Sequence, residues 1–66
     1  MAKRLGAMLK KLRLKNGLTQ EELGKKVGVS DAYITMLETG ARKNPSLDLL
    51  KRLAKALKVK VAELVE

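Results

Sequence analysis

The feature that most constrains the fold of this 66-residue chain is a three-residue break, Gly28-Val29-Ser30. The break separates two helical patterns that are each too short to be stable alone. The first pattern begins at Thr19, which Glu22 follows at the spacing of a capping box. It ends at Gly28, since glycine adopts the left-handed backbone conformation at little steric cost. Both helices therefore depend on a shared tertiary core.

The second pattern predicts a helix over 31–39. Ser30 is its N-cap, and Asp31 lies in the first turn, where the helix dipole favours a negative charge. Gly40 ends it. Two helices joined by a short turn containing glycine form a helix-turn-helix, here over about 19–39. The sharp turn lets the first helix brace the second, which projects outward, and a helix about 10–12 Å across fits the DNA major groove.

Apolar residues at helical spacing predict three further helices, over about 3–15, 46–57 and 60–65. Asn16-Gly17 ends the first of these, and Ser46 caps the second, with Asn44 as the alternative cap. No segment shows the alternation of a β-strand, so we expect an all-α fold of five helices in a single domain, 1–66. The expected core residues are Leu5, Met8, Leu9, Leu12, Leu23, Val27, Ile34, Leu37, Leu47, Leu50, Leu53, Ala54, Leu57, Val61, Leu64 and Val65.

The composition narrows the function classes. A net charge of +8 favours a polyanionic partner, with nucleic acid ahead of an acidic membrane surface or an acidic protein. Cysteine and histidine are absent, which argues against an enzyme, a metal site, a cofactor or a small-molecule substrate. The lack of cysteine, of a secretory signal and of an apolar run of about 20 residues indicates a cytoplasmic protein that does not bind membranes.

Several linked motifs occur in order along the chain: Thr19-Gln20-xx-Leu23, Gly28-Val29-Ser30, Ile34-xx-Leu37-Glu38-x-Gly40, Pro45-Ser46-Leu47 and Leu53-Ala54-xx-Leu57. At this spacing the chain resembles the Cro and phage-repressor, or XRE, type of helix-turn-helix domain from Leu12 to Leu64. The resemblance implies a lambda-repressor-like fold and a sequence-specific transcriptional regulator that binds double-stranded DNA as a homodimer. Helix 31–39 would be the recognition helix in the major groove.

The same resemblance assigns roles to individual residues. The DNA base-facing residues would be Asp31, Ala32, Thr35 and Met36. The phosphate-contacting residues would be Thr19, Gln20, Ser30, Tyr33, Thr39, Arg42, Lys43 and Asn44. A structural ion pair between Arg13 and Glu38 would link the first helix to the recognition helix.

Some residues keep two interpretations. Asp31 either compensates the helix dipole or accepts a hydrogen bond from a cytosine, and Tyr33 either lies on the DNA backbone or extends the core. Family members often carry bidentate polar side chains where this chain has Ala32 and Met36, so we expect a large contribution from phosphate contacts. Lys58 and Lys60 replace the glycine and the Ser or Asp cap usual in the family, which leaves the start of the last helix less well defined.

A second function from another class stays open at this point. Domains that resemble this one occur in coactivators and antitoxins, where the helical surface binds a protein. A dimer would have to use the domain itself, and its natural candidate is the C-terminal helix. The residues Val59, Val61, Leu64 and Val65 could belong either to the core or to a dimer surface. Lysines and arginines of the first helix, including Lys3, Arg4, Lys10, Lys11 and Lys15, would form a solvated face.

Overall fold

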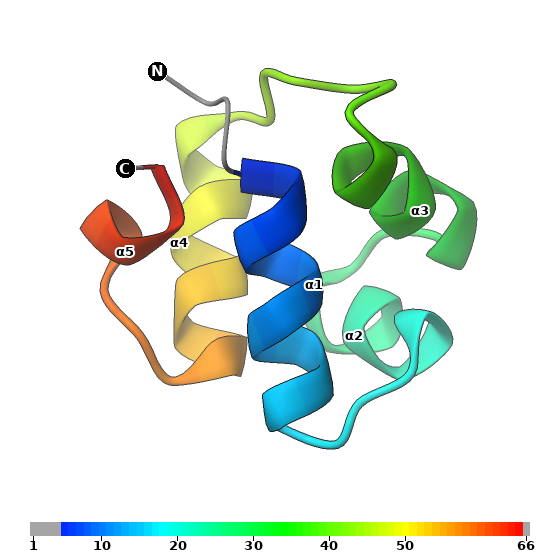
Figure 1. The fold of residues 1–66 in the computed structure, drawn as a ribbon, viewed down its shortest axis with the longest axis horizontal. Coiled ribbons are helices and arrows are strands. Elements are labelled where there is room, and N and C mark those ends of the chain that lie inside the picture. Colours follow the sequence, from blue (N-terminus) through cyan, green and yellow to red (C-terminus); the bar gives the residue numbers. More distant parts are fainter. Residues whose placement is uncertain (1–4, 66) are drawn as a thin grey trace.

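The computed structural model describes residues 5–65, which form five helices around one core (Figure 1). These helices are α1 (Leu5–Lys15), α2 (Gln20–Val27), α3 (Asp31–Thr39), α4 (Leu47–Leu57) and α5 (Val61–Val65). α1 runs through the middle, with α2 and α3 on one side and α4 and α5 on the other (Figure 1). The described residues contain no strand, so the expected all-α fold is confirmed. Lys3 and Arg4, expected in the first helix, lie outside the described residues.

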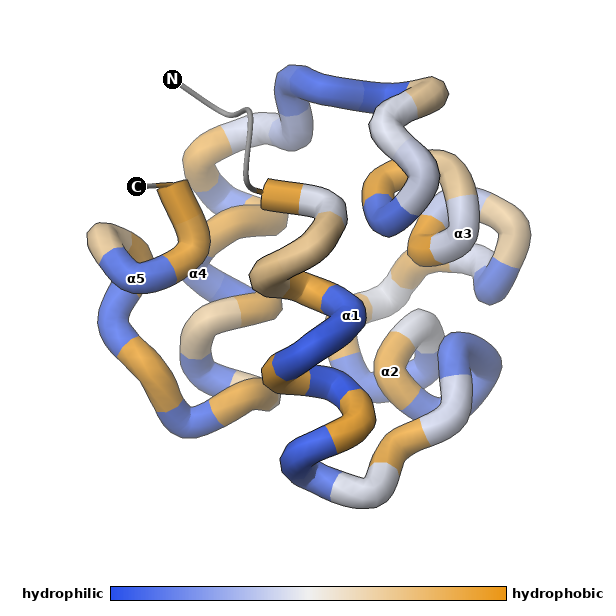
Figure 2. Tube along the Cα trace, viewed as in Figure 1, coloured by the Kyte–Doolittle hydropathy of each residue, from blue (hydrophilic) through white to orange (hydrophobic). Residues whose placement is uncertain are grey.

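The core draws side chains from every helix. Apolar and polar positions alternate along α1 and α4 with helical spacing (Figure 2), so that one side of each helix is apolar. Burying one such aliphatic side chain is worth about 1.5–3 kcal/mol. The buried apolar residues are Leu5, Leu9, Leu12, Leu23, Val27, Ile34, Leu37, Leu49, Leu53, Ala54, Leu57 and Leu64.

The expected core of α4 was wrong at its beginning. Leu47 is 61% exposed, whereas Leu49, which was not expected in the core, is 5% exposed. Residues two positions apart lie on nearly opposite sides of a helix, so only one of the two faces inward. Leu47 is also the first residue of the helix, just after the Ser46 N-cap. Four further residues expected in the core are only partly buried, namely Met8, Leu50, Val61 and Val65.

Three predicted N-caps are present, and they explain where the short helices begin. The Thr19 hydroxyl accepts a hydrogen bond from the Glu22 backbone N–H at 3.0 Å, and the Glu22 carboxylate accepts one from the Thr19 N–H at 2.8 Å. Ser30 and Ser46 accept from backbone N–H groups three residues onward, each at 3.1 Å. Each cap is worth about 1 kcal/mol. The capping box inferred from the sequence is therefore confirmed.

Lys58 ends α4 in the left-handed conformation, with φ 62°, and is the one non-glycine residue among those described with a positive φ. Its backbone N–H donates to the carbonyls of Ala54 and Lys55. The next helix begins without a Ser or Asp cap: the backbone N–H of Lys60 instead donates to the Glu63 carboxylate at 3.0 Å. The chain thus forms the turn between α4 and α5 without the residues that the resemblance would place there.

We expect Lys58→Gly to raise the free energy of unfolding by about 0.5–1 kcal/mol. The left-handed conformation costs an L-residue about 1–2 kcal/mol, and the greater chain entropy of glycine offsets part of that gain. Urea denaturation at constant ionic strength measures the change. Lys58→Ala is the matched control, because it removes the same charge and keeps the strained conformation. A glycine variant no more stable than the alanine variant would contradict this account.

Candidate nucleic-acid interface

Helix α3, the predicted recognition helix, is buried on one side and open on the other. Ile34 and Leu37 are at most 1% exposed and pack in the core against α1 and α2. Asp31 and Ala32 are exposed at the N-terminal end of the helix, and Met36 is half-buried one turn further on. The edge of α3 that was expected to face DNA bases is therefore accessible.

Two close backbone approaches hold α3 in place, and both occur at glycines whose role was not recognised in the sequence. A Cβ atom at Gly6 of α1 would lie 2.5 Å from the carbonyl oxygen of Glu38. A Cβ atom at Gly24 of α2 would lie 2.6 Å from the carbonyl oxygen of Val29, in the turn before α3. Glycine inside a helical pattern was the available signal, since it weakens a helix unless close packing requires it.

Arg13 and Glu38 form the ion pair implied by the resemblance. Arg13 Nε donates to Glu38 Oε2 at 2.6 Å, and Nη2 donates to Oε1 at 3.2 Å. The side chains are 8% and 4% exposed, and the remaining guanidinium nitrogen, Nη1, donates to the Leu18 carbonyl at 2.8 Å. A pair removed from water in this way is stable only when its polar atoms are satisfied. No buried side-chain nitrogen or oxygen in residues 5–65 lacks a hydrogen-bond partner.

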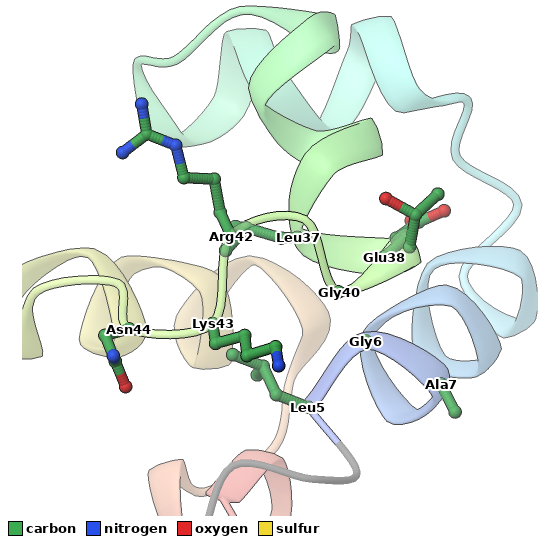
Figure 3. A pocket seen from close by; sticks show the side chains of 10 residues that line it. Leu5, Gly6, Ala7, Leu37, Glu38, Gly40, Arg42, Lys43 and Asn44 are labelled. Carbon is green, nitrogen blue, oxygen red and sulfur yellow. The ribbon is translucent and has the colours of Figure 1, made fainter.

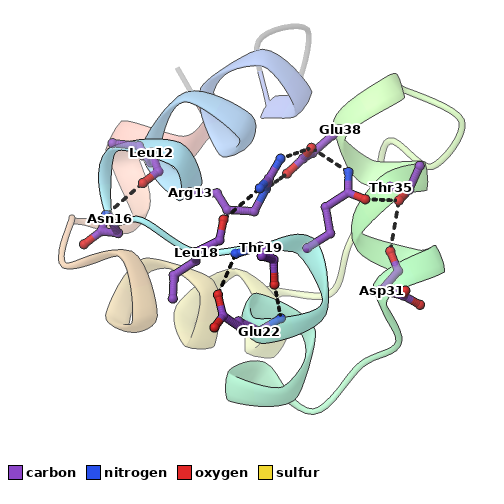
Figure 4. Close-up of polar contacts among 10 residues, drawn as sticks. Leu12, Arg13, Asn16, Leu18, Thr19, Glu22, Asp31, Thr35 and Glu38 are labelled. Carbon is purple, nitrogen blue, oxygen red and sulfur yellow. Dashed lines mark hydrogen bonds and ion pairs between the residues drawn. The ribbon is translucent and has the colours of Figure 1, made fainter.

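The ion pair continues into a chain of hydrogen bonds that joins α2 to α3 (Figure 4). Gln20 Nε2 donates to Glu38 Oε1 at 3.0 Å. The Thr35 hydroxyl lies 2.7 Å from Gln20 Oε1 and 3.1 Å from the Asp31 carbonyl, both of which are acceptors. Because the Glu38 carboxylate only accepts, the Gln20 amide must turn its nitrogen toward Glu38. The structure thus brings together two residues, Gln20 and Thr35, to which separate DNA contacts were assigned.

Other residues assigned to phosphate contact lie at the N-terminal ends of α2 and α3 or at the C-terminal end of α3. Thr19 and Ser30 are exposed, but their hydroxyls already cap helices. The Thr39 hydroxyl is 3.4 Å from the Met36 carbonyl, at the exposed C-terminal end of α3. Figure 1 shows the loop that follows α3 on the side away from α2.

That loop carries two exposed cationic residues shortly after the end of α3. Its exposed residues include Arg42, Lys43 and Asn44. The Arg42 backbone N–H donates to the Met36 carbonyl at 3.0 Å, and the Arg42 guanidinium carbon lies 5.9 Å from the Tyr33 ring centroid. This distance suits a cation–π contact. The contact keeps the half-buried Tyr33 ring beside the loop.

A hollow of about 630 Å³ borders the same loop (Figure 3). In Figure 3 the Lys43 side chain extends toward Leu5, whereas the Arg42 side chain points away from it. The two cationic side chains therefore lie over different parts of the surface. The hollow lies between the start of α1, the end of α3 and the loop, and its lining residues are Leu5, Gly6, Ala7, Leu37, Glu38, Thr39, Gly40, Arg42, Lys43 and Asn44.

The described part of the chain offers little to other kinds of site. Residues 5–65 hold no group of three or more histidine, cysteine, aspartate or glutamate side chains placed to share a metal ion. Within the same range, no helix has both the length and the apolar character needed to cross a bilayer.

Comparisons with known proteins agree with this geometry. A family model described as helix-turn-helix matches residues 9–64. The HTH-type transcriptional regulator y4dJ of Sinorhizobium fredii, itself uncharacterized, is 45% identical over 65 residues, which are 98% of this chain and 83% of that protein. The biofilm regulator SinR, solved in complex with DNA, superposes with a TM-score of 0.89 at 31% identity, covering 94% of this chain and 98% of that one.

The P22 c2 repressor, solved with a synthetic operator, gives a TM-score of 0.88 at 32% identity, covering 94% of this chain and 92% of that one. Two short helices, α2 and α3, joined by a turn that begins at Gly28 form a helix-turn-helix. The chain belongs to the XRE-type helix-turn-helix family, to which phage repressors belong.

We expect Arg13→Met and Glu38→Gln each to lower the free energy of unfolding by about 3–5 kcal/mol, because each leaves a buried charged partner uncompensated. In a domain of this size the melting temperature should fall by more than about 12 °C, measured by circular dichroism. Lys25→Gln is the control, since it breaks an exposed ion pair with Glu21 at 3.8 Å and should change stability by less than about 0.5 kcal/mol. Equal effects in all three variants would contradict a structural role for the buried pair.

Proposed function

We propose that this transcriptional regulator inserts α3 into the major groove of double-stranded DNA. The observation that carries the proposal is the accessible edge of α3, held rigidly from behind by the Arg13–Glu38 pair. SinR and the P22 c2 repressor, which share this fold, were solved with DNA, and this supports duplex DNA as the partner. A pre-positioned helix binds without first losing conformational freedom.

The base contacts would be few and partly apolar. Ala32 and Met36 can pack on thymine methyl groups, and Asp31 can accept a hydrogen bond from cytosine N4. None of these supplies the bidentate hydrogen bonds that Gln, Asn or Arg make to purines, each worth about 1–3 kcal/mol of discrimination. Thr35 would face the bases only with its methyl group, since its hydroxyl is engaged with Gln20 and the Asp31 carbonyl.

Phosphate contacts would therefore supply much of the affinity. Gln20 keeps one amide hydrogen beyond the one given to Glu38, and it lies at the N-terminus of α2, where the dipole and free N–H groups favour an anion. Thr19 and Ser30 are exposed at the N-terminal ends of α2 and α3 and would add phosphate contacts there. Tyr33, Thr39, Arg42, Lys43 and Asn44 would contact the other strand from the opposite end of α3.

We propose further that the protein acts as a cytoplasmic homodimer and performs no catalytic step. Repressor domains of this type bind half-sites one helical turn apart, about 34–36 Å. Val59, Val61 and Val65 are only partly buried around α5, which supports this region as the contact between copies. The absence of cysteine from the chain supports a reducing compartment.

The affinity for duplex DNA should fall steeply with salt, because neutralised phosphates release counterions. We expect Arg42→Gln combined with Lys43→Gln to reduce the slope of log K against log salt by about 2, or about 1 for each lost phosphate contact. Fluorescence anisotropy at several salt concentrations measures the slope. Lys10→Gln with Lys11→Gln is the matched control, since it removes the same charge from the exposed face of α1. Equal slopes in the two double variants would contradict contact by the loop.

Selection from random duplex DNA should enrich one motif for the natural chain and a different one for Ala32→Gln. A glutamine in that position adds a bidentate contact to adenine, worth about 1–3 kcal/mol of discrimination. Lys11→Gln should retain the natural motif. If a correctly folded chain enriches no motif but still captures a protein partner, the domain is an interaction module of the coactivator or antitoxin kind, and the DNA-reading proposal is wrong.

A further inference from the structure

The positive charge of this chain is concentrated away from the surface that would read DNA. Residues 17–40, which hold the helix-turn-helix, carry two basic and four acidic side chains, and α3 itself has no basic residue. Residues 41–60 carry seven basic side chains and one acidic. Arg42 and Lys43 adjoin α3, but the remaining five lie on α4 or after it. The recognition surface therefore accounts for little of the net charge of +8.

Four of the basic side chains gather in one place, where the C-terminal ends of α2 and α4 meet. Lys26, Arg52, Lys55 and Lys58 line a hollow of about 460 Å³, together with Ala56. We infer that this α2–α4 basic face binds the phosphate backbone of a second DNA duplex while α3 occupies the first. The inference rests on the proposed function, because it assumes that α3 holds one duplex.

The geometry of the face suits an anion with several charges. Arg52 is held in place: its Nη1 donates to the Val27 carbonyl at 2.8 Å and its Nη2 to Asp48 at 2.7 Å. Lys26, Lys55 and Lys58 are exposed, and none of them pairs with a carboxylate within residues 5–65. Complementing the dipoles of α2 and α4 explains a lysine at each helix end. The helix dipoles do not account for Lys58, and they do not account for the position of all three lysines around one hollow.

The surroundings of the face favour nucleic acid over a protein or a membrane. Interfaces between proteins usually centre on apolar or aromatic side chains, whereas interfaces with DNA are more polar and positively charged. Among the described residues that line the hollow, Ala56 is the only apolar one, and it is partly buried. A helix that binds a membrane surface presents large apolar residues beside its cations, and this lining has none.

Two duplexes can be accommodated at once. α3 packs on α1 and α2, α4 packs on α2 and α5, and the two helices lie on opposite sides of α1 (Figure 1). Repulsion between the two duplexes is largely screened wherever they lie farther apart than the Debye length of about 8 Å at physiological salt.

The test measures bridging directly. A donor-labelled duplex carrying the selected motif and an acceptor-labelled duplex without it are mixed with the full chain at physiological salt. We expect energy transfer with the natural chain and a loss of about tenfold or more in the triple variant Lys26→Gln, Lys55→Gln and Lys58→Gln. The control is Lys10→Gln, Lys11→Gln and Lys15→Gln, which removes the same charge from exposed positions of α1 and should retain bridging. Circular dichroism melting checks that both variants fold.

Each outcome separates this inference from the proposed function. Anisotropy with the motif duplex alone reports binding by α3, and it should be nearly unchanged in the α2–α4 variant. Bridging that survives in that variant, or that falls equally in the α1 control, overturns the inference and leaves the proposed function standing. Stronger competition by polyglutamate than by unlabelled duplex would also overturn it, since the face would then prefer an acidic protein. If no motif is selected but bridging by random duplexes falls only in the α2–α4 variant, the proposed function fails and the basic face remains a DNA-binding surface.

Discussion

The buried ion pair between Arg13 and Glu38 decides how the recognition helix is presented. A guanidinium and a carboxylate withdrawn from water lose much of their hydration, so the pair is stable only when every polar atom has a partner. Here those partners come from α1, α3, Gln20 at the start of α2 and the carbonyl of Leu18. The requirement for complete satisfaction therefore fixes three helices relative to one another. That arrangement sets the orientation of the exposed edge of α3.

This support has a consequence for DNA reading. Gln20 and Thr35 are drawn into the hydrogen-bond chain behind the motif, which leaves fewer polar groups free at the edge of α3. What remains there is one carboxylate, an alanine and a methionine. We expect a surface of this kind to discriminate weakly between bases and to depend on phosphate contacts. Most of the basic residues lie on other faces, so the exposed edge of α3 carries a carboxylate and no basic residue while the rest of the domain is positive.

Local features of the fold were predictable because short-range chemistry controls them. Thr19, Ser30 and Ser46 cap helices through bonds to backbone groups three residues away, and Gly28 and Gly40 end helices by adopting positive φ. The polar network was not predictable in the same way. The resemblance to repressors supplied Arg13 and Glu38 as a pair, but the links to Gln20 and Thr35 join residues 15 to 18 positions apart and depend on side-chain placement.

The sequence by itself determined the number of helices, nearly all of their ends and the turn that places α3 at the surface, because caps, glycines and apolar spacing act within a few residues. The tertiary structure decided which residues come together between helices. It placed Leu49 rather than Leu47 in the core, held Lys58 in a conformation usual for glycine, and brought the ends of α2 and α4 together as one basic face. These outcomes depend on how helices pack across long sequence separations, and a local pattern carries no information on that packing.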